Sequence, residues 1–141
     1  MAASASGDAS TGSASMTNDA HTTIQELKDL VAKFRDERGW AVHHTPKNLA
    51  MSIAIEAAEL MEHFQWDDYT QAQQQGIADE LSDILAYCFN LADTLGIDVS
   101  AAYRDKIRRN AQKFPTDIFS PGHDDAAAYN RIKKEYRARK K

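Results

Sequence analysis

The sequence IADELSDILAYCFNLADTLG occupies residues 77–96 and, more than any other segment, sets the expected architecture. Its large apolar residues are separated by alternating steps of four and three, at Ile77, Leu81, Ile84, Cys88, Leu91 and Leu95. This spacing places one apolar stripe along a helix and is typical of a long helix packed in a bundle. Because glycine readily takes the left-handed conformation that ends a helix, we expect this helix to stop at Gly96.

The segments before residue 77 have the same helical periodicity. Residues 24–38 carry apolar side chains at i, i+3 and i+7, and this first helix should end near Gly39. Residues 40–45 have no such pattern and are expected to form a loop. Thr45 can cap the next helix and Pro46 suits its first position. The apolar stripe of this second helix is expected to run from Leu49 to Phe64 and to be closed by residues 67–68.

Two more helices are expected after Gly96. Asp98 can cap a fourth helix that ends at residues 114–115, with Val99, Ala102 and Tyr103 facing inward. Residues 120–122 are a turn, and a basic amphipathic helix should follow from about Asp124. No segment alternates as a β-strand does. The sequence therefore predicts an all-α protein with a four-helix core and an extra C-terminal helix.

Composition divides the chain into three parts. Residues 1–20 are mostly small and polar, so they cannot bury enough apolar surface to offset the entropy of ordering, and we expect a disordered tail. Residues 21–115 should form one domain, and residues 116–141 a C-terminal extension. The single cysteine excludes an internal disulfide, and no apolar run approaches the roughly 18–20 residues that span a bilayer. Since no basic residue precedes Lys28, no targeting signal is expected, and we predict a cytoplasmic protein without membrane contact.

Two acidic motifs indicate the chemistry. Glu56-Ala-Ala-Glu59 and Glu80-Leu-Ser-Asp83 each place two carboxylates one helical turn apart, beside an apolar stripe. Four acids that converge from neighbouring helices repel each other unless a cation lies among them. Oxygen ligands of this kind suit Mg²⁺ (or Mn²⁺), which commonly acts together with a substrate phosphate. The alternative is that these acids are ordinary solvent-facing residues.

Two residues beside the first motif deserve separate assignments. Glu62 lies one turn beyond Glu59 and could be a further ligand or the base that activates a water molecule. His63 lies four residues after Glu59 and is more typical of a hydrogen-bonded neighbour than of a ligand. A di-iron carboxylate site would require two Glu-x-x-His motifs, which are absent, so magnesium or manganese is favoured over iron.

Polar and aromatic residues offer further candidate contacts to a nucleotide. Lys106, Asn110 and Lys113 form a stripe at i, i+4 and i+7 that could hold phosphates or a base edge. Such stripes are also common on exposed helices. Trp40, Trp66 and Tyr87 could stack on a nucleobase, or could equally cover the core or anchor an interface.

Four segments together resemble the MazG-like all-α nucleoside triphosphate pyrophosphatases, and most closely their dCTP pyrophosphatase branch. The segments are Thr45-Pro-Lys-Asn-Leu49, Glu56-Ala-Ala-Glu-Leu-Met-Glu-His-Phe-Gln-Trp66, Asp79-Glu-Leu-Ser-Asp83 and Lys106-Ile-Arg-Arg-Asn-Ala-Gln-Lys-Phe-Pro115. The resemblance covers residues 24–115 in the family's order and spacing.

This resemblance implies a Mg²⁺-dependent hydrolysis of a (deoxy)nucleoside triphosphate, with dCTP favoured, to the monophosphate and pyrophosphate. It implies that the metal ligands are Glu56, Glu59, Glu80 and Asp83, and we predict Glu59 or Glu62 as the catalytic base. The substrate contacts that it implies are Trp40, Trp66, Tyr87, Lys106 and Asn110. It further implies a homodimer or homotetramer, with residues of a neighbouring chain completing the site.

The chain departs from the dCTP branch at two positions. Val31 replaces a histidine of the first helix, and Thr94 replaces an arginine late in the third. Both departures concern the choice of nucleobase, and neither concerns the metal ligands.

Two other functions are alternatives to the enzyme. One is a non-catalytic helical association module. The other is a nucleic-acid-binding module that uses the basic tail, which has seven basic residues and one acid between Arg131 and Lys141. Because this tail has few interleaved aromatic residues, a solvated helix end is favoured over a nucleic-acid contact.

Overall fold

A computed structural model describes residues 17–66, 68–122 and 125–139. Within these residues there are only helices, turns and loops, without a strand, so the expected all-α class is confirmed. The elements in chain order are α1 (Ile24–Glu37), the 3₁₀ helix η1 (Trp40–His43), α2 (Pro46–Glu62), the 3₁₀ helix η2 (Gln71–Gln73), α3 (Gln74–Thr94), α4 (Val99–Lys113) and α5 (Ala126–Ala138).

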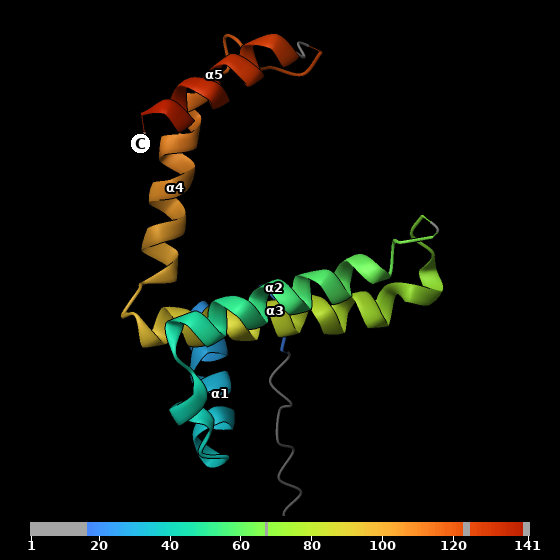
Figure 1. Cartoon of the computed structure of the whole chain (residues 1–141), viewed down its shortest axis with the longest axis vertical. Helices are drawn as coiled ribbons and strands as arrows, with labels where there is room; N and C mark the ends of the chain where they lie inside the picture. The colour runs from blue at the N-terminus through green and yellow to red at the C-terminus, as the bar shows by residue number, and fades with distance from the viewer. Residues whose placement is uncertain (1–16, 67, 123–124, 140–141) are drawn as a thin grey trace, which may run out of the picture.

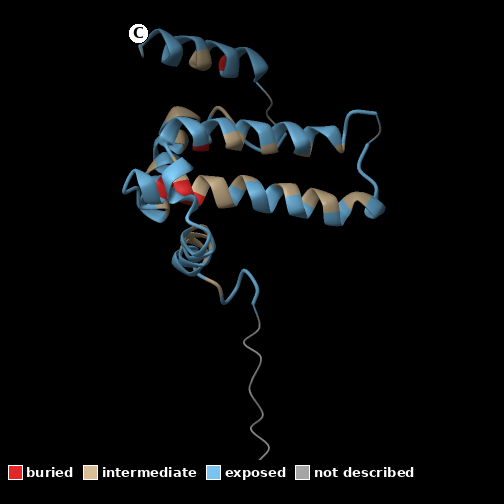
Figure 2. Ribbon diagram, turned by 60° about the horizontal axis from the view of Figure 1, so that its bottom comes forward, coloured by how far each residue is buried: buried red, intermediate tan, exposed pale blue. Residues whose placement is uncertain are grey.

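Helices α2 and α3 form a long antiparallel hairpin, and α1 crosses α3 near one end of it (Figure 1). The buried core lies at this end, where the start of α2 meets the end of α3 (Figure 2). Leu49 of α2 is fully buried there, together with Phe89 and Ala92 of α3. The opposite end of the hairpin extends beyond α1, so its side chains are more exposed.

The capping residues act as the sequence predicts. The Thr45 hydroxyl accepts a hydrogen bond from the Asn48 backbone N–H at 3.2 Å, and the Asp98 carboxylate accepts one from Ala101 N–H at 2.9 Å. Just past the end of α3, Gly96 has a φ of 64°, in the left-handed region that glycine readily adopts. The following N–H of Ile97 donates back to the Ala92 carbonyl at 2.8 Å, which closes the helix sharply.

Helix α4 leaves the hairpin at a steep angle. The α3 segment, counted from Gln71, and α4 are bent by 102° at the break between them, and α4 projects away from α1–α3 (Figure 1). Of the described helices, none alone is long and apolar enough to cross a bilayer, although this bent pair meets the criterion together. Tyr103, expected to face inward, is 67% exposed, because none of the described helices of the same chain covers this part of α4.

Helix α5 packs against the far end of α4. The Phe114 ring stacks on Tyr129 with centroids 5.5 Å apart and contacts Phe119 edge-on at 5.6 Å. The Lys113 ammonium lies over the Tyr136 ring, 3.6 Å from its centroid. Helices α4 and α5 thus form an arm, which we call the α4–α5 arm.

The structure differs in detail from the expectation at residues 40–45, at the end of α2 and in the last residues of the N-terminal tail. Residues 40–43 form a 3₁₀ helix instead of an irregular loop. Helix α2 ends at Glu62, before Phe64, because the Phe64 N–H bonds to Met61 in a tightened last turn. Residues 1–16 of the expected disordered tail and residues 67 and 124 lie outside the described part of the chain. Residues 18–22 form a hydrogen-bonded turn.

Candidate active site

Carboxylates of α2 and α3 approach one another across the hairpin, and we call Glu56, Glu59, Glu80 and Asp83 the acid cluster; Asp83 is close enough for its charge to act on Glu56. One carboxylate oxygen from each of Glu56, Glu59 and Glu80 lies within 4.8 Å of the others. The i, i+3 spacing directs each pair to one side of its helix, and the antiparallel arrangement brings the two pairs together. The structure therefore places the two predicted motifs at one locus.

The acid cluster carries uncompensated negative charge. The pKa of Glu56 is raised, first because the carboxylate is partly buried, and then because the charges of Glu59, Asp83 and Glu80 act on it. None of the ion pairs among the described residues supplies a lysine or arginine to these four acids. Oxygen donors this close together, without a protein cation, fit a divalent metal ion such as Mg²⁺.

A cavity of about 470 Å³ lies beside the acid cluster toward the loop between α2 and α3. We call it the hairpin-end cavity. Its lining residues are Glu59, Glu62, His63, Trp66, Gln73 and Glu80. The Gln73 side-chain amide donates a hydrogen bond to the His63 carbonyl at 2.7 Å, which links the end of α2 to the start of α3.

A second cavity, of about 230 Å³, lies on the other side of the acid cluster, where α1 and η1 approach α3. We call it the α1-side cavity. Its walls are formed by Val31, Phe34, Arg35, Trp40, His44, Glu56, Asp83, Ala86, Tyr87 and Asn90. The acid cluster contributes to both cavities and therefore lies between them.

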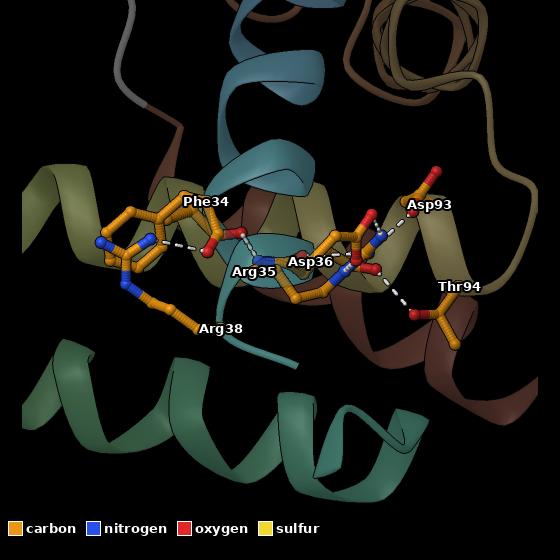
Figure 3. Close-up of polar contacts among 8 residues, drawn as sticks. Phe34, Arg35, Asp36, Arg38, Asp93 and Thr94 are labelled. Carbon is orange, nitrogen blue, oxygen red and sulfur yellow. Dashed lines mark hydrogen bonds and ion pairs between the residues drawn. The ribbon is translucent and has the colours of Figure 1, made fainter. Parts of the chain in front are cut away.

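Trp40 is held in the wall of the α1-side cavity by its neighbours. Its ring meets Phe34 edge-on, with centroids 5.7 Å apart. The Arg38 guanidinium lies 3.6 Å from the centroid of the Phe34 ring and donates a hydrogen bond to the Phe34 carbonyl at 3.0 Å (Figure 3). This packing fixes the position of the aromatic wall.

The predicted substrate contacts fall into three places. Trp40 and Tyr87 line the α1-side cavity together with two of the acids, whereas Trp66 lines the hairpin-end cavity. The two tryptophans are therefore not brought together within one chain. Lys106 and Asn110 lie on α4, which projects away from the hairpin, and they line neither cavity.

Three residues of the α1-side cavity were missed by the sequence analysis: Arg35, His44 and Asn90. Asn90 could have been found, because it is a polar residue between Phe89 and Leu91 in an otherwise apolar part of α3. Arg35 and His44 carry no such local signal, since charged residues are common on an amphipathic helix and in a loop.

Comparison with known proteins finds one matching family model and several named relatives. The model of the MazG-like family matches residues 51–121, which contain the whole acid cluster. Mouse and human dCTP pyrophosphatase 1 are 33% and 32% identical to the chain over 104 residues, which is 68% of the chain. The bovine protein of the same name is 29% identical over 126 residues. The chain spans 61% of the length of the mouse and human relatives.

Among solved structures, the fold is similar to the crystal structure of a pyrophosphatase from Archaeoglobus fulgidus. The similarity has a TM-score of 0.63 at 39% sequence identity, and it covers 67% of this chain and 94% of that one. The shared region therefore takes in nearly all of the archaeal protein.

Proposed function

The chain belongs to the MazG-like family, and from this premise we propose that it is a divalent-metal-dependent nucleoside triphosphate pyrophosphatase that prefers dCTP. The reaction is hydrolysis of the triphosphate to the monophosphate and pyrophosphate. The preference for dCTP is supported by the names of the mouse, human and bovine relatives. The general activity is also supported by the pyrophosphatase from Archaeoglobus fulgidus.

The observation that carries this proposal is the position of the acid cluster between two cavities. The α1-side cavity is lined by the aromatic residues Trp40 and Tyr87 and suits the nucleobase of the substrate. The hairpin-end cavity is lined mainly by acidic and polar groups, and it suits the β- and γ-phosphates when a divalent metal ion lies between them and the carboxylates. A triphosphate lying between the two places its α-phosphate beside the acid cluster.

The chain's own residues divide the work of hydrolysis. Glu56, Glu59, Glu80 and Asp83 hold Mg²⁺, or Mn²⁺ in its place, and this ion supplies charge neutralisation for the phosphates and a lowered pKa for water. Glu59 or Glu62 accepts the proton of the water that attacks the α-phosphorus. The bond from the α-phosphorus to the bridging oxygen breaks, and pyrophosphate leaves through the hairpin-end cavity.

The active form is proposed to be a homodimer or a homotetramer. Apolar side chains on both long helices stay uncovered within one chain, among them Ile55 on α2 (54% exposed) and Leu81 on α3 (50% exposed). The exposed Tyr103 and Ile107 on α4 likewise need a partner surface. A second copy would cover these faces, and its α4 would bring Lys106 and Asn110 toward the acid cluster.

The test is a pyrophosphate-release assay with dCTP, dUTP, dTTP, dATP and dGTP, each with and without Mg²⁺. We expect release that requires the metal and is fastest with dCTP. Light scattering of the same sample should give twice or four times the mass of the chain. Absence of hydrolysis with every triphosphate in the presence of Mg²⁺ and of Mn²⁺ would reject the proposal.

A further inference from the structure

The α1-side cavity contains an unusual buried amide. Asn90 is 4% exposed and is the one buried polar side chain among the described residues of the chain. It lies seven residues after Asp83 on α3, so it is displaced about 10 Å along the helix from the acid cluster. Tyr87 lies between the two on the same face. An acid, an aromatic ring and an amide therefore follow one another along one wall of the cavity.

The orientation of this amide is fixed by two hydrogen bonds. The Asn90 Oδ1 accepts from Arg35 Nη1 at 3.3 Å, and Nδ2 donates to the Ala86 carbonyl at 3.1 Å. Arg35 is itself held, because its Nη1 also donates to Asp93 Oδ2 at 2.9 Å, and its Nε and Nη2 donate to the two carboxylate oxygens of Asp36 at 2.7 and 3.1 Å (Figure 3). Rotation of the Asn90 amide by 180° would break both of its bonds.

The cavity wall retains unused hydrogen-bonding capacity. An asparagine side chain offers two donor hydrogens and two acceptor lone pairs, and the contacts above use one of each. The Nδ1 atom of His44, which lines the same cavity, is buried and has no hydrogen-bond partner in the described part of the chain. Burying a polar group without a hydrogen-bond partner costs free energy. Binding of a ligand that supplies partners to these groups is therefore favoured.

The size and shape of the cavity restrict this ligand. Its volume of about 230 Å³ is below the roughly 300 Å³ at which pockets for drug-sized ligands begin. The cavity cannot enclose a whole nucleotide, whereas a single small planar ring can enter it beside Trp40 and Tyr87, which both line it. A pyrimidine presents a donor and an acceptor side by side on one edge, and this edge matches the remaining capacity of the Asn90 amide.

We propose that Asn90, held in one orientation by Arg35, is the residue that distinguishes cytosine from uracil and thymine in the substrate. Cytosine presents an exocyclic amine and a ring nitrogen acceptor, while uracil and thymine present a carbonyl acceptor and a ring N–H donor in the opposite order. An amide that cannot rotate pairs with one order and opposes the other. Arg35 is then a positioning residue. This inference rests on the proposed pyrophosphatase activity.

The test compares kcat/KM for dCTP and dUTP in four proteins: the wild type, Asn90→Asp, Arg35→Met and Leu91→Ala. Asn90→Asp removes the donor with little change in size. Arg35→Met keeps the amide but removes one of the two hydrogen bonds that hold its orientation, so that only the bond to the Ala86 carbonyl remains. Leu91→Ala is the matched control, because it perturbs α3 next to Asn90 without changing a polar group of the cavity. Circular dichroism verifies that each variant is helical.

We expect the ratio of kcat/KM for dCTP to that for dUTP to fall on the order of tenfold to a hundredfold in Asn90→Asp and in Arg35→Met. The ratio should be unchanged in Leu91→Ala even if its stability is lower. An unchanged ratio in both Asn90→Asp and Arg35→Met, with wild-type hydrolysis intact, would overturn this inference and leave the proposed function standing. A wild type that hydrolyses no triphosphate would overturn both. If one cavity variant fails to fold, the ratio measured in the other decides.

Discussion

The imidazole of His63 occupies the space directly over Gly76: a Cβ at position 76 would lie 2.6 Å from the His63 Cε1 atom. Side-chain carbons essentially never approach so closely, so the missing side chain of Gly76 makes room for the ring. The contact joins the end of α2 to the start of α3 in the hairpin-end cavity. It lies beside Glu59 and Glu80, which belong to the same cavity wall.

Gly76→Ala should reduce activity by displacing His63. We expect kcat/KM to fall on the order of tenfold, because small displacements of groups in an active site are costly. The free energy of unfolding should change little, since alanine favours the helix by up to about 1 kcal/mol and the steric clash opposes this gain. In a His63→Ala background the same substitution should have no effect on kcat/KM. An equal loss of kcat/KM in both backgrounds would contradict the proposed coupling between position 76 and His63.

Glu80→Gln should abolish stabilisation by Mg²⁺, whereas Asp79→Asn should preserve it. Asp79 is the matched control, because it is the neighbouring acid on α3, is exposed and bonds to Gln75. A metal at one hundred times its dissociation constant stabilises a folded protein by about 2.7 kcal/mol. Thermal unfolding with and without Mg²⁺ measures this gain. A gain in Glu80→Gln as large as in the wild type would remove Glu80 from the set of ligands.

Glu59→Gln should abolish hydrolysis without unfolding the protein. The substitution removes a negative ligand and a candidate base, and a general base alone contributes typically 10²–10⁴-fold to a rate. Glu37→Gln is the control, because Glu37 is an exposed glutamate of α1 that faces Lys33 at 3.8 Å. Pyrophosphate release and circular dichroism are measured in parallel. Near-normal turnover in Glu59→Gln would reject its assignment as ligand or base.

Glu56→Gln should stabilise the metal-free protein at neutral and higher pH. The raised pKa of Glu56 means that the folded state binds this proton more tightly than the unfolded state does. The free energy of unfolding of the wild type therefore falls as pH rises from the pKa of an unfolded glutamate, about 4.3, through the raised folded value. Above that window the penalty is constant, and below it the penalty disappears.

The measurement is the melting temperature of the wild type and of Glu56→Gln in EDTA between pH 4 and pH 8. The difference should favour the variant at pH 8 and shrink as pH falls through the window. Carboxylates with lowered pKa, such as Asp36 and Asp105, are present in both proteins and cancel from the comparison. A variant that is less stable than the wild type at pH 8 would contradict the inference that the charge of Glu56 destabilises the metal-free acid cluster.

The helices of this protein are strongly encoded in local sequence. The seam of α3 and the caps at Thr45, Asp98 and Gly96 depend only on residues a few positions apart, so pattern and chemistry predict them. The end of α2 was predicted less well, because Phe64 continues the apolar stripe although the helix has already closed at Glu62. An apolar residue just past a helix end fits the same periodicity as one inside it.

The candidate site was predicted unevenly for a similar reason. The acid cluster could be predicted because its two motifs lie on helices that a short connection forces into an antiparallel pair. The contact between Arg35 and Asn90 joins residues 55 positions apart, and it depends on how α1 crosses α3, which periodicity does not specify. The inward position expected for Tyr103 was wrong, because no surface among the described residues of the same chain covers its side chain.

The departure of the α4–α5 arm from the hairpin has a genetic consequence. If each active centre combines the carboxylates of one polypeptide with Lys106 of another, two different defective polypeptides can repair each other. Glu59→Gln and Lys106→Ala should each be inactive alone, yet mixed assemblies of the two, formed by co-expression, should regain about a quarter of the centres in a dimer by random pairing. Complementation of this kind would show that Lys106 acts in the active site of a neighbouring subunit. Its absence would indicate that Lys106 acts in the active site of its own chain.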